Sequence, residues 1–451
     1  MNDPNGPIFW KGAYHVFYQY NPNAPLWGNM HWAHAISEDM IHWRHLPVAL
    51  TPTPGWDDAD GCFTGSAVDD HGTATILYTG VKSVAKERAT LRDGHNNFRE
   101  VQCLATSTDP QLRTWTKWKQ PVIEPPNDPS LAGFRDPFLW RHGDDWILGV
   151  ASGHFKKGGC ILLYRSKDLR NWEPLHELTI GHWTEKQSIN AVESGEMWEC
   201  PDFFPLGKKH VLLYSTAGSV VWESGELDPK QLKFHSERRG ILDHGAYYAQ
   251  KTQLDAHGNR ILWGWIPEKR SDSELITAGW AGCMALPRIL SLSPDGYLEM
   301  TVAPEAQSLR EKSYSLSPKK SATDTEVLQF ILIEDLRAEL AWKPAAQNFA
   351  LTLEDHSGPW WSASIAKNSS ATTLTVNGIT ARIPDDATAH DFRLFLDASV
   401  AELIVDCRHA MTSRIYRKPD GPLHVKIGNH SPLVTLEGWQ LRRISPDRLT
   451  T

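Results

Sequence analysis

The chain of 451 residues is longer than one ordinary hydrophobic core, and this length suggests two domains. Its formal net charge of −8 and the lack of a basic block in the sequence argue against nucleic acid as a partner. No run of about eighteen apolar residues occurs, so neither a transmembrane helix nor a membrane partner is expected.

A turn that contains glycine recurs five times along the chain, and an apolar, aromatic-rich run follows it each time. Glycine supplies the positive φ that tight turns require, so each turn with its flanking segments predicts a β-hairpin. The turn glycines, spaced by 60, 71, 64 and 51 residues, are Gly12, Gly72, Gly143, Gly207 and Gly258. The runs that follow them are residues 14–20, 75–78, 146–150, 210–214 and 261–265.

Five strand-rich repeats of this size predict an all-β fold that begins with a five-bladed β-propeller. A single blade cannot bury its own faces and must pack on its neighbours, which explains the need for a repeat. A Ser-x-Asp sequence that leads to a tryptophan supports the repeat at residues 37–43, 107–115 and 166–172. The periodicity alone leaves one alternative open, a long β-sandwich with accidental spacing.

The composition changes after about residue 300. Residues 304–310 fit a short helix or a linker with proline near its start, and residues 313–325 are rich in Ser, Lys and Thr. Further on, Asn377-Gly378 between two alternating runs predicts a type I′ hairpin. We therefore predict a propeller domain over residues 1–300, a linker over 301–325 and a β-sandwich over 326–451.

Three acidic residues, Asp3, Asp136 and Glu199, lie seven to nine residues before a turn glycine. This spacing predicts matching positions on the first strands of three repeats, and first strands line the central channel of a propeller. The three side chains would then converge in a carboxylate-lined sugar site. Asp-Pro and Asn-Gly pairs are also ordinary turn formers, and Arg135 with Asp136 also fits a structural ion pair.

Eight motifs in order along the chain resemble glycoside hydrolase family 32, which holds invertases, inulinases, levanases and related fructosyltransferases. They are NDPNG (2–6), FYQYNP (17–22), WG (27–28), WAHA (32–35), FTGS (63–66), FRDP (134–137), WECP (198–201) and GWAG (279–282). Residues 394–402 are similar to part of the family's second domain. The resemblance implies a five-bladed propeller joined to a β-sandwich.

The resemblance also implies a β-fructofuranosidase that releases terminal β-D-fructofuranosyl units from sucrose or fructans by double displacement. Retention needs two carboxyl groups roughly 5 Å apart, one to attack and one to protonate the leaving oxygen. By resemblance Asp3 is the nucleophile, Glu199 is the acid/base and Asp136 stabilises the transition state. The resemblance assigns substrate binding to Asn2, Gln19, Trp27, Phe63, Ser66 and Arg135, with Asp243 and Trp280 as further contacts.

Two alternatives stay open beside hydrolysis. One is a fructosyltransferase of the same family, in which a sugar takes the place of water. The other is a non-catalytic propeller that binds fructans. The expected partner is a small carbohydrate and no cofactor is implied, because two carboxyl groups and a water molecule suffice. For Trp27 and Trp280, a sugar platform and a packing role are both open. The sequence indicates neither the oligomeric state nor a preference among sucrose, inulin and levan.

The six cysteines are scattered, so we expect mostly free and buried thiols, with a single disulfide left open. Cys200 follows Glu199 directly, and strand alternation predicts that it points away from the channel. His31 with His34 and His42 with His45 have a spacing that places each pair on opposite faces of a strand. No metal site is therefore expected.

The nucleophile motif begins at the second residue of the chain, whereas relatives have a stretch of chain before it. A trimmed segment, a start codon assigned too late and a true lack of this piece are all consistent with the sequence. We expect such a terminus to fray unless it is held in place. We expect no signal peptide within this chain, and the localisation stays open because the expected shortening of the N-terminus would hide one.

Overall fold

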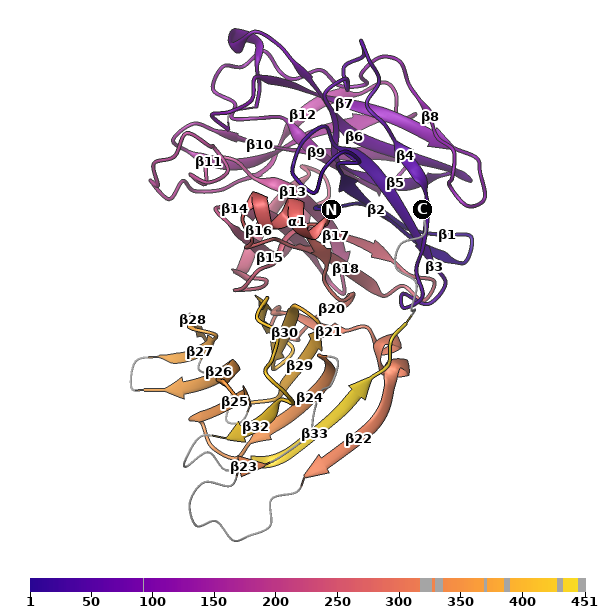
Figure 1. Ribbon diagram of the computed structural model, residues 1–451. Helices are drawn as coiled ribbons and strands as arrows, with labels where there is room; N and C mark the ends of the chain where they lie inside the picture. Colours follow the sequence, from indigo (N-terminus) through magenta and orange to yellow (C-terminus); the bar gives the residue numbers. More distant parts are fainter. Residues whose placement is uncertain are drawn as a thin grey trace. The chain divides into compact units, whose positions relative to one another are not determined.

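Strands make up most of the computed structural model, which describes residues 1–91, 93–316, 327–328, 336–368, 371–384, 390–427 and 433–444 (Figure 1). These residues divide into two compact units. The first contains Met1–Ile241 and Tyr248–Ala303, and the second contains Leu242–Tyr247 and the described residues from Pro304 onward. The all-β prediction is confirmed. The described residues include one α-helix, α1 (Asp272–Ala278), and two short 3-10 helices, η1 (Lys86–Arg88) and η2 (Pro304–Leu309).

Five antiparallel sheets form the described part of the first unit, and the chain completes each sheet before it begins the next. The first two sheets are β1 (Pro4–Trp10), β2 (Ala13–Tyr20), β3 (His31–Ser37) and β4 (Arg44–Leu50), then β5 (Gly61–Asp70), β6 (Thr73–Ser83), β7 (Phe98–Ser107) and β8 (Thr116–Lys117). The third and fourth are β9 (Arg135–His142), β10 (Asp145–His154), β11 (Gly158–Ser166) and β12 (Glu173–Ile180), then β13 (Glu199–Leu206), β14 (Lys209–Thr216), β15 (Ser219–Asp228) and β16 (Lys233–Ile241). The fifth is β17 (Tyr248–Leu254), β18 (Arg260–Ile266), β20 (Arg288–Leu292) and β21 (Leu298–Val302), with β19 (Cys283–Met284) also paired to β18.

The predicted glycine turn joins the first two strands of each of these sheets. Its glycines have φ values of 90, 88, 60, 61 and 81° at Gly12, Gly72, Gly143, Gly207 and Gly258. An L side chain is strained in this left-handed region, whereas glycine is not. A Cβ atom added at any of the five would meet nothing within 4 Å. Backbone conformation therefore selects glycine at these turns, and lack of space does not.

The repeated Ser-x-Asp sequence forms the turn between the third and fourth strands of the first three sheets. In the first sheet, Asp39 Oδ1 accepts hydrogen bonds from two backbone N–H groups of the turn, at 2.9 and 2.8 Å. The indole N–H of Trp43 then donates to the carbonyl oxygen of Met40 at 3.0 Å. Trp115 and Trp172 make the same contact in the next two sheets. The sequence motif thus marks a hydrogen-bonded turn.

The first strands of the five sheets contact one another in a closed ring. β1 contacts β5, β5 contacts β9, β9 contacts β13, β13 contacts β17, and β17 contacts β1. Buried apolar side chains pack the first sheet on the second, the second on the third, the third on the fourth, and the fifth on the first. This arrangement is a β-propeller, in which the first strands surround the centre.

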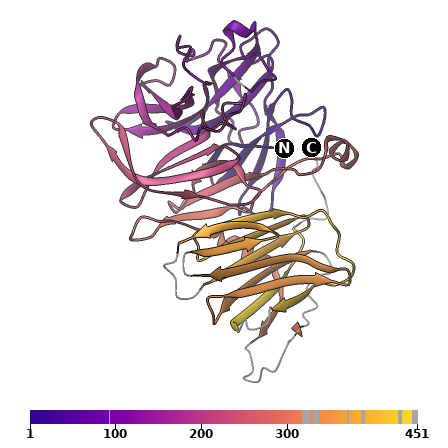
Figure 2. The ribbon, with the colours of Figure 1, turned by 90° about the vertical axis from the view of Figure 1, so that its left-hand side faces the viewer.

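The second unit contains two sheets in its described residues, and Figure 2 shows its strands in orange and yellow. One sheet has the order β22 (Arg310–Leu316), β33 (Leu433–Leu441), β24 (Arg337–Pro344), β29 (Phe392–Asp397), β30 (Val400–Val405) and β31 (His409–Arg414). The other has the order β23 (Val327–Leu328), β32 (His424–Ile427), β25 (Phe349–Asp355), β26 (Gly358–Lys367), β27 (Thr372–Val376) and β28 (Ile379–Ile383).

Buried apolar residues of both sheets form one core in the second unit, which makes it a β-sandwich. Leu340 and Leu394 come from one sheet, and Leu351 and Ile365 come from the other. The predicted Asn377-Gly378 hairpin joins β27 to β28, with φ values of 47 and 81° that fit a type I′ turn. The segment expected to be a linker ends β21 and continues into η2 and β22, while residues 317–325 lie outside the described residues.

Four of the six cysteines, Cys62, Cys103, Cys160 and Cys200, are buried with free thiols, as expected. Cys283 is half-buried and Cys407 is exposed. None of the helices in the described ranges has the length and apolar character needed to cross a bilayer.

Candidate active site

The first strand of each of the five sheets carries a β-bulge near its start. The register with the second strand shifts between Asn5 and Ile8, Cys62 and Gly65, Arg135 and Phe138, Glu199 and Asp202, and Tyr248 and Lys251. A bulge bends its strand and changes the direction of its side chains. Asp136 and Cys200 lie in two of these bulges with φ values of 61 and 47°, which is a costly conformation for residues other than glycine.

Asp3 directly precedes β1 and presents its carboxylate to residues of two other sheets. Oδ2 accepts a hydrogen bond from Thr64 Oγ1 at 2.7 Å and from Cys200 Sγ at 3.4 Å. Oδ1 accepts from Asn2 Nδ2 at 3.1 Å. Burial raises the pKa of Asp3, and the neighbouring Glu199 acts in the same direction, whereas the hydrogen bonds partly oppose the rise.

Asp136 is the second residue of β9 and is only 3% exposed. Its Oδ2 accepts a hydrogen bond from the backbone N–H of Cys200 at 2.7 Å. Its own N–H donates to Thr79 Oγ1 at 2.8 Å, which fixes the bulged backbone. Burial raises the pKa of Asp136 to about 7 and Glu199 adds to the rise, although the adjacent Arg135 lowers it.

Glu199 opens β13 with a side chain that is a quarter exposed. Its Oε1 accepts a hydrogen bond from Arg135 Nη2 at 2.8 Å, and its Oε2 accepts from the phenol of Tyr248 at 2.9 Å. These donors come from β9 and β17, the first strands of the two neighbouring sheets. Two neighbouring sheets therefore hold the carboxylate in one orientation.

A fully buried carboxylate on β7, Glu100, fixes Arg135 in turn. Its Oε1 accepts from Arg135 Nη1 at 2.8 Å, and its Oε2 accepts from the backbone N–H of Phe134, also at 2.8 Å. Arg135 thus bridges Glu100 and Glu199. Such charge-assisted bonds are short and directional, so the bridge restricts the position of Glu199.

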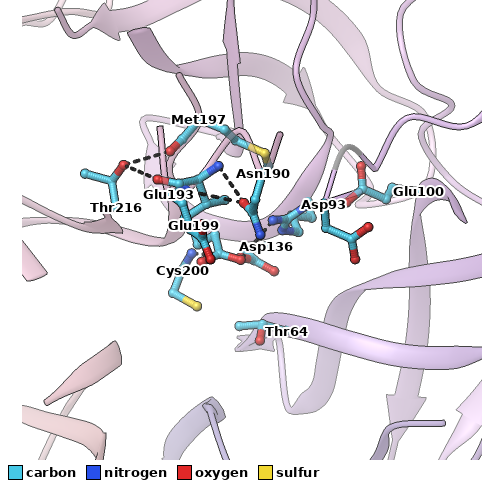
Figure 3. A network of polar contacts seen from close by, with 12 residues as sticks. Thr64, Asp93, Glu100, Asp136, Asn190, Glu193, Met197, Glu199, Cys200 and Thr216 are labelled. Atoms are coloured by element: carbon cyan, nitrogen blue, oxygen red, sulfur yellow. Dashed lines mark hydrogen bonds and ion pairs between the residues drawn. The ribbon is translucent and has the colours of Figure 1, made fainter. Parts of the chain in front are cut away.

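Cys200 ties the three predicted acids together. Its thiol contacts Asp3, its N–H binds Asp136, and Glu199 precedes it in the chain. Figure 3 shows Asp136, Glu199 and Cys200 gathered in this way, with Thr64 nearby. The structure therefore brings together carboxylates from three sheets, the arrangement that acid/base and nucleophilic chemistry on a sugar requires.

Residues 1–302 match the family model described as the glycosyl hydrolases family 32 N-terminal domain. A sucrose-6-phosphate hydrolase from Escherichia coli is 35% identical, over 98% of this chain and 92% of the relative. The chain belongs to glycosyl hydrolase family 32. Among solved structures, a β-fructofuranosidase from Bombyx mori is similar with a TM-score of 0.78 and 31% identity, covering 99% of this chain and 92% of that one. A fructan 1-exohydrolase from Cichorium intybus has a TM-score of 0.83 at 25% identity, covering 98% and 95%.

Membership of family 32 makes the protein a glycoside hydrolase with fructosidase activity. The resemblance seen in the sequence motifs is confirmed, as is the combination of propeller and sandwich. The hypothesis of a non-catalytic binding propeller is therefore set aside.

The spacing of the three acids predicted matching positions on the first strands. In this family 32 protein they do not occupy matching positions. In the register of the sheets, Glu199 corresponds to Arg135, because both lie directly before the bulge. Asp136 lies one position later, inside the bulge, and Asp3 lies two positions before its equivalent, Asn5. The prediction of equivalence was wrong, because a spacing of seven to nine residues does not fix the register.

The prediction for Cys200 was also wrong. Strand alternation would turn its side chain away from that of Glu199, yet the thiol lies 3.4 Å from Asp3 Oδ2. The left-handed backbone at Cys200 breaks the alternation.

Several predicted substrate-binding residues surround Asp3. Asn2 Nδ2 also donates to Gln19 Oε1 at 2.9 Å, and Gln19 Nε2 donates to Thr64 Oγ1 at 2.7 Å. Phe63 is buried next to Thr64 in the chain. The ring of Trp27 lies edge-on to Phe63 at 5.8 Å and is 54% exposed, so a buried packing role for Trp27 is excluded. Ser66 is half-buried on β5, two residues after Thr64.

The segment around Trp280 lies against the start of the chain. Ala281 accepts a hydrogen bond from the amino group of Met1 at 2.7 Å, and Asn2 N–H donates to the carbonyl of Gln19 at 3.1 Å. These two hydrogen bonds hold the first residues of the chain in place, which is the condition under which no fraying is expected. Trp280 is 42% exposed and the guanidinium of Arg270 covers its ring at 4.1 Å.

Asp243 belongs to the second unit, and its carboxylate is engaged there. Oδ1 accepts from the N–H groups of Gly245 and Thr412, both at 2.9 Å, and Oδ2 accepts from Thr412 Oγ1 at 2.6 Å. At 2% exposure, Asp243 is bound within its own unit. A substrate contact from Asp243 stays a prediction, and these bonds weigh against it.

Sequence reasoning missed four residues of the site: Thr64, Glu100, Cys200 and Tyr248. Thr64 and Cys200 lie inside motifs of the family resemblance, so their position in FTGS and WECP was an available signal. Glu100 had no such signal, because its contact depends on the packing of β7 against β9.

The histidines that are close together in the sequence contact other residues and not each other. His34 binds His15, His42 binds Asp39 and His45 binds Tyr18.

Proposed function

We propose that the protein is a retaining β-fructofuranosidase that cleaves sucrose-type substrates at the anomeric carbon of a terminal fructosyl unit. The observation that carries the proposal is the group of Asp3, Asp136 and Glu199, held by Arg135, Tyr248 and Thr64. The names of the relatives support the substrate class, since they act on sucrose 6-phosphate or are fructofuranosidases.

In the first step, a carboxylate oxygen of Asp3 forms a bond to the anomeric carbon of the fructosyl unit. The bond from that carbon to the leaving oxygen breaks, and Glu199 transfers its proton to this oxygen. The positive charge that develops on the ring is stabilised by the carboxylate of Asp136, which also accepts hydrogen bonds from ring hydroxyls.

In the second step, Glu199 takes a proton from a water molecule, whose oxygen bonds to the anomeric carbon while the bond to Asp3 breaks. Two inversions give net retention. Glu199 must therefore reach both the leaving oxygen and the incoming water from one position, which is the role we give to its two donors, Arg135 and Tyr248.

Methanol tests the stereochemistry directly, because it replaces water in the second step and yields a methyl fructofuranoside whose configuration does not mutarotate. With sucrose and methanol as substrates, we expect methyl β-D-fructofuranoside as the first product, and NMR identifies its anomeric configuration. The α-anomer as first product would show an inverting mechanism and overturn the proposed roles.

The roles of single residues are tested with Asp3→Asn and Glu199→Ala. Each is expected to keep the melting temperature within a few degrees and to lose hydrolysis by several orders of magnitude. Azide, a nucleophile that needs no general base, should partly restore turnover of Glu199→Ala and not of Asp3→Asn. Full activity in either variant would remove that residue from the mechanism.

The substrate and the acceptor are settled by product chromatography. Sucrose, sucrose 6-phosphate, 1-kestose, inulin and levan are supplied separately, and kcat/KM is compared among them. Release of free fructose supports the hydrolase, whereas oligosaccharides longer than the substrate at high sucrose would assign the protein as a fructosyltransferase.

A further inference from the structure

A cluster of metal-binding side chains lies on the third sheet, apart from the residues of the proposed mechanism. His154 ends β10, Cys160 lies near the start of β11 and Glu177 lies on β12. One ligand atom of each, an imidazole nitrogen, the thiol sulfur and a carboxylate oxygen, lies within 4.8 Å of the other two.

The sheet register places all three side chains on one face. Cys160 pairs with Ser152 on β10, and His154 lies two residues further along the same strand, so both side chains point the same way. Glu177 pairs with Leu162, which lies two residues after Cys160 on β11, so its side chain is on the same face. A bulge between Cys160 and Leu162 shifts the register of β12 relative to β11. The cluster thus follows from the pairing of three adjacent strands.

The three groups differ in their access to solvent. Cys160 is fully buried, whereas the side chains of His154 and Glu177 are 15% and 31% exposed. The thiol therefore lies beneath an imidazole and a carboxylate that solvent reaches, which gives a cation a path of entry. His154 Nδ1 lies 3.3 Å from Ser130 Oγ, an outer partner that holds the ring.

We propose that His154, Cys160 and Glu177 bind one zinc ion, with a water molecule as the fourth ligand. Sulfur, nitrogen and oxygen donors in a tetrahedral set are typical of Zn²⁺, whereas Mg²⁺ and Ca²⁺ prefer oxygen ligands alone. Without the ion, His154 Nε2 and Glu177 Oε1 are joined by a hydrogen bond. The zinc replaces this bond, so the proton that His154 holds on Nε2 moves through solvent to Nδ1, which faces Ser130, and the thiol of Cys160 releases its proton to solvent.

This site is at variance with the expectation of no metal drawn from the sequence. That expectation considered histidine pairs close together in the chain. The ligands proposed here are 6 and 17 residues apart, on three strands, so no short motif could indicate them.

The probe for the test is Co²⁺, which takes the same ligands as Zn²⁺ and reports a thiolate ligand by a charge-transfer band in the near ultraviolet. The full chain is treated with EDTA, freed of chelator and titrated with Co²⁺. We expect a saturable band with one equivalent bound, which Zn²⁺ then displaces. Zn²⁺ should also raise the melting temperature of the metal-free protein.

Two variants test the ligands, and a third serves as their control. Cys160→Ser is expected to abolish the band, and Glu177→Gln to weaken binding by at least about tenfold. Cys103→Ser, another buried cysteine outside the cluster, is the matched control and should bind as the wild type does. Because Glu177 is partly exposed, its variant should fold even if Cys160→Ser does not. No saturable band, or equal binding by Glu177→Gln and the wild type, would overturn the proposal.

Discussion

The substitution Asp136→Asn separates stability from catalysis in this protein. The carboxylate of Asp136 is 3% exposed, and its Oδ2 accepts from the backbone N–H of Cys200. Asparagine has nearly the same shape and keeps a carbonyl oxygen for this bond, but it carries no charge that burial can penalise. We therefore expect the variant to be more stable than the wild type at neutral pH and above, and to be nearly inactive.

The magnitude follows from the pKa of Asp136, which rises from an ordinary value of 3.8 to about 7 on folding. The folded protein therefore holds this proton more tightly than the unfolded chain. The resulting stabilisation is fully present below pH 3.8 and is lost as the pH rises to about 7. At about 1.4 kcal/mol per pH unit, the loss is on the order of 4 kcal/mol. The variant lacks the titrating group, so its stability does not fall in this way as the pH rises.

The assay is urea unfolding followed by tryptophan fluorescence, at steps from pH 4 to pH 8. The free energy of unfolding of Asp136→Asn should equal that of the wild type at pH 4 and exceed it by about 4 kcal/mol at pH 8. Hydrolysis should fall by on the order of a thousandfold, because the positive charge of the transition state loses a facing carboxylate. Parallel stability profiles of the two proteins would refute the reasoning.

Asp58→Asn is a matched control for burial of a carboxylate. Asp58 is as buried as Asp136 but pairs with the ammonium of Lys117 and accepts from Tyr78 Oη at 2.7 Å. Its replacement leaves Lys117 without its ionic partner, so we expect lower stability, opposite to the effect at Asp136.

Three further substitutions test how the site is held. Thr64→Val removes a hydrogen bond that lowers the pKa of Asp3, so this pKa rises further. The acid limb of kcat/KM, which needs both Asp3 and Asp136 in the ionised form, should then move to higher pH through its Asp3 component. Tyr248→Phe removes the donor to Glu199 Oε2 and should lower kcat about 10- to 100-fold, measured at saturating sucrose. Glu100→Gln weakens the clamp on Arg135 and should lower kcat by about tenfold or more while KM changes little.

Conservative or matched variants accompany the tests of Thr64 and Glu100. Thr64→Ser keeps the hydroxyl and should restore the acid limb, so an equal shift in both variants would contradict the role of the hydrogen bond. Glu223→Gln changes a buried glutamate of the fourth sheet that accepts from Tyr214 Oη at 2.7 Å. This substitution should change stability and leave kcat unchanged. If kcat falls by a similar factor in Glu223→Gln and Glu100→Gln, the role of Glu100 is structural and it does not position Glu199.

Much of the fold could be predicted from sequence because local chemistry determines its turns. The hairpin glycines need positive φ, and the Ser-x-Asp motif provides its own hydrogen bonds, so both leave a mark in the sequence. The fifth sheet is different. Between β18 and β20 the chain forms α1 and β19, and no periodic pattern in the sequence indicates this insertion.

The boundary between the two units was harder to predict for a related reason. The change in composition predicts a linker over residues 301–325, whereas β22, which starts at Arg310, pairs with β33 from the C-terminal part of the chain. Residues Leu242–Tyr247 belong to the second unit although they lie in the middle of the first in sequence. Pairings at such separations leave no local pattern.

The site itself shows where sequence reasoning ends. The chain position of Asp3, Asp136 and Glu199 is readable from motifs, but their contacts depend on bulges that shift the register at the start of each first strand. A bulge puts adjacent residues on the same side, so the alternation rule fails at the positions that line the centre. This is why Cys200 reaches both Asp3 and Asp136 from a position next to Glu199. The strained backbone that brings these groups together is thus part of how the propeller builds the proposed catalytic site, and it explains why the predictions from strand alternation and spacing fail at these residues.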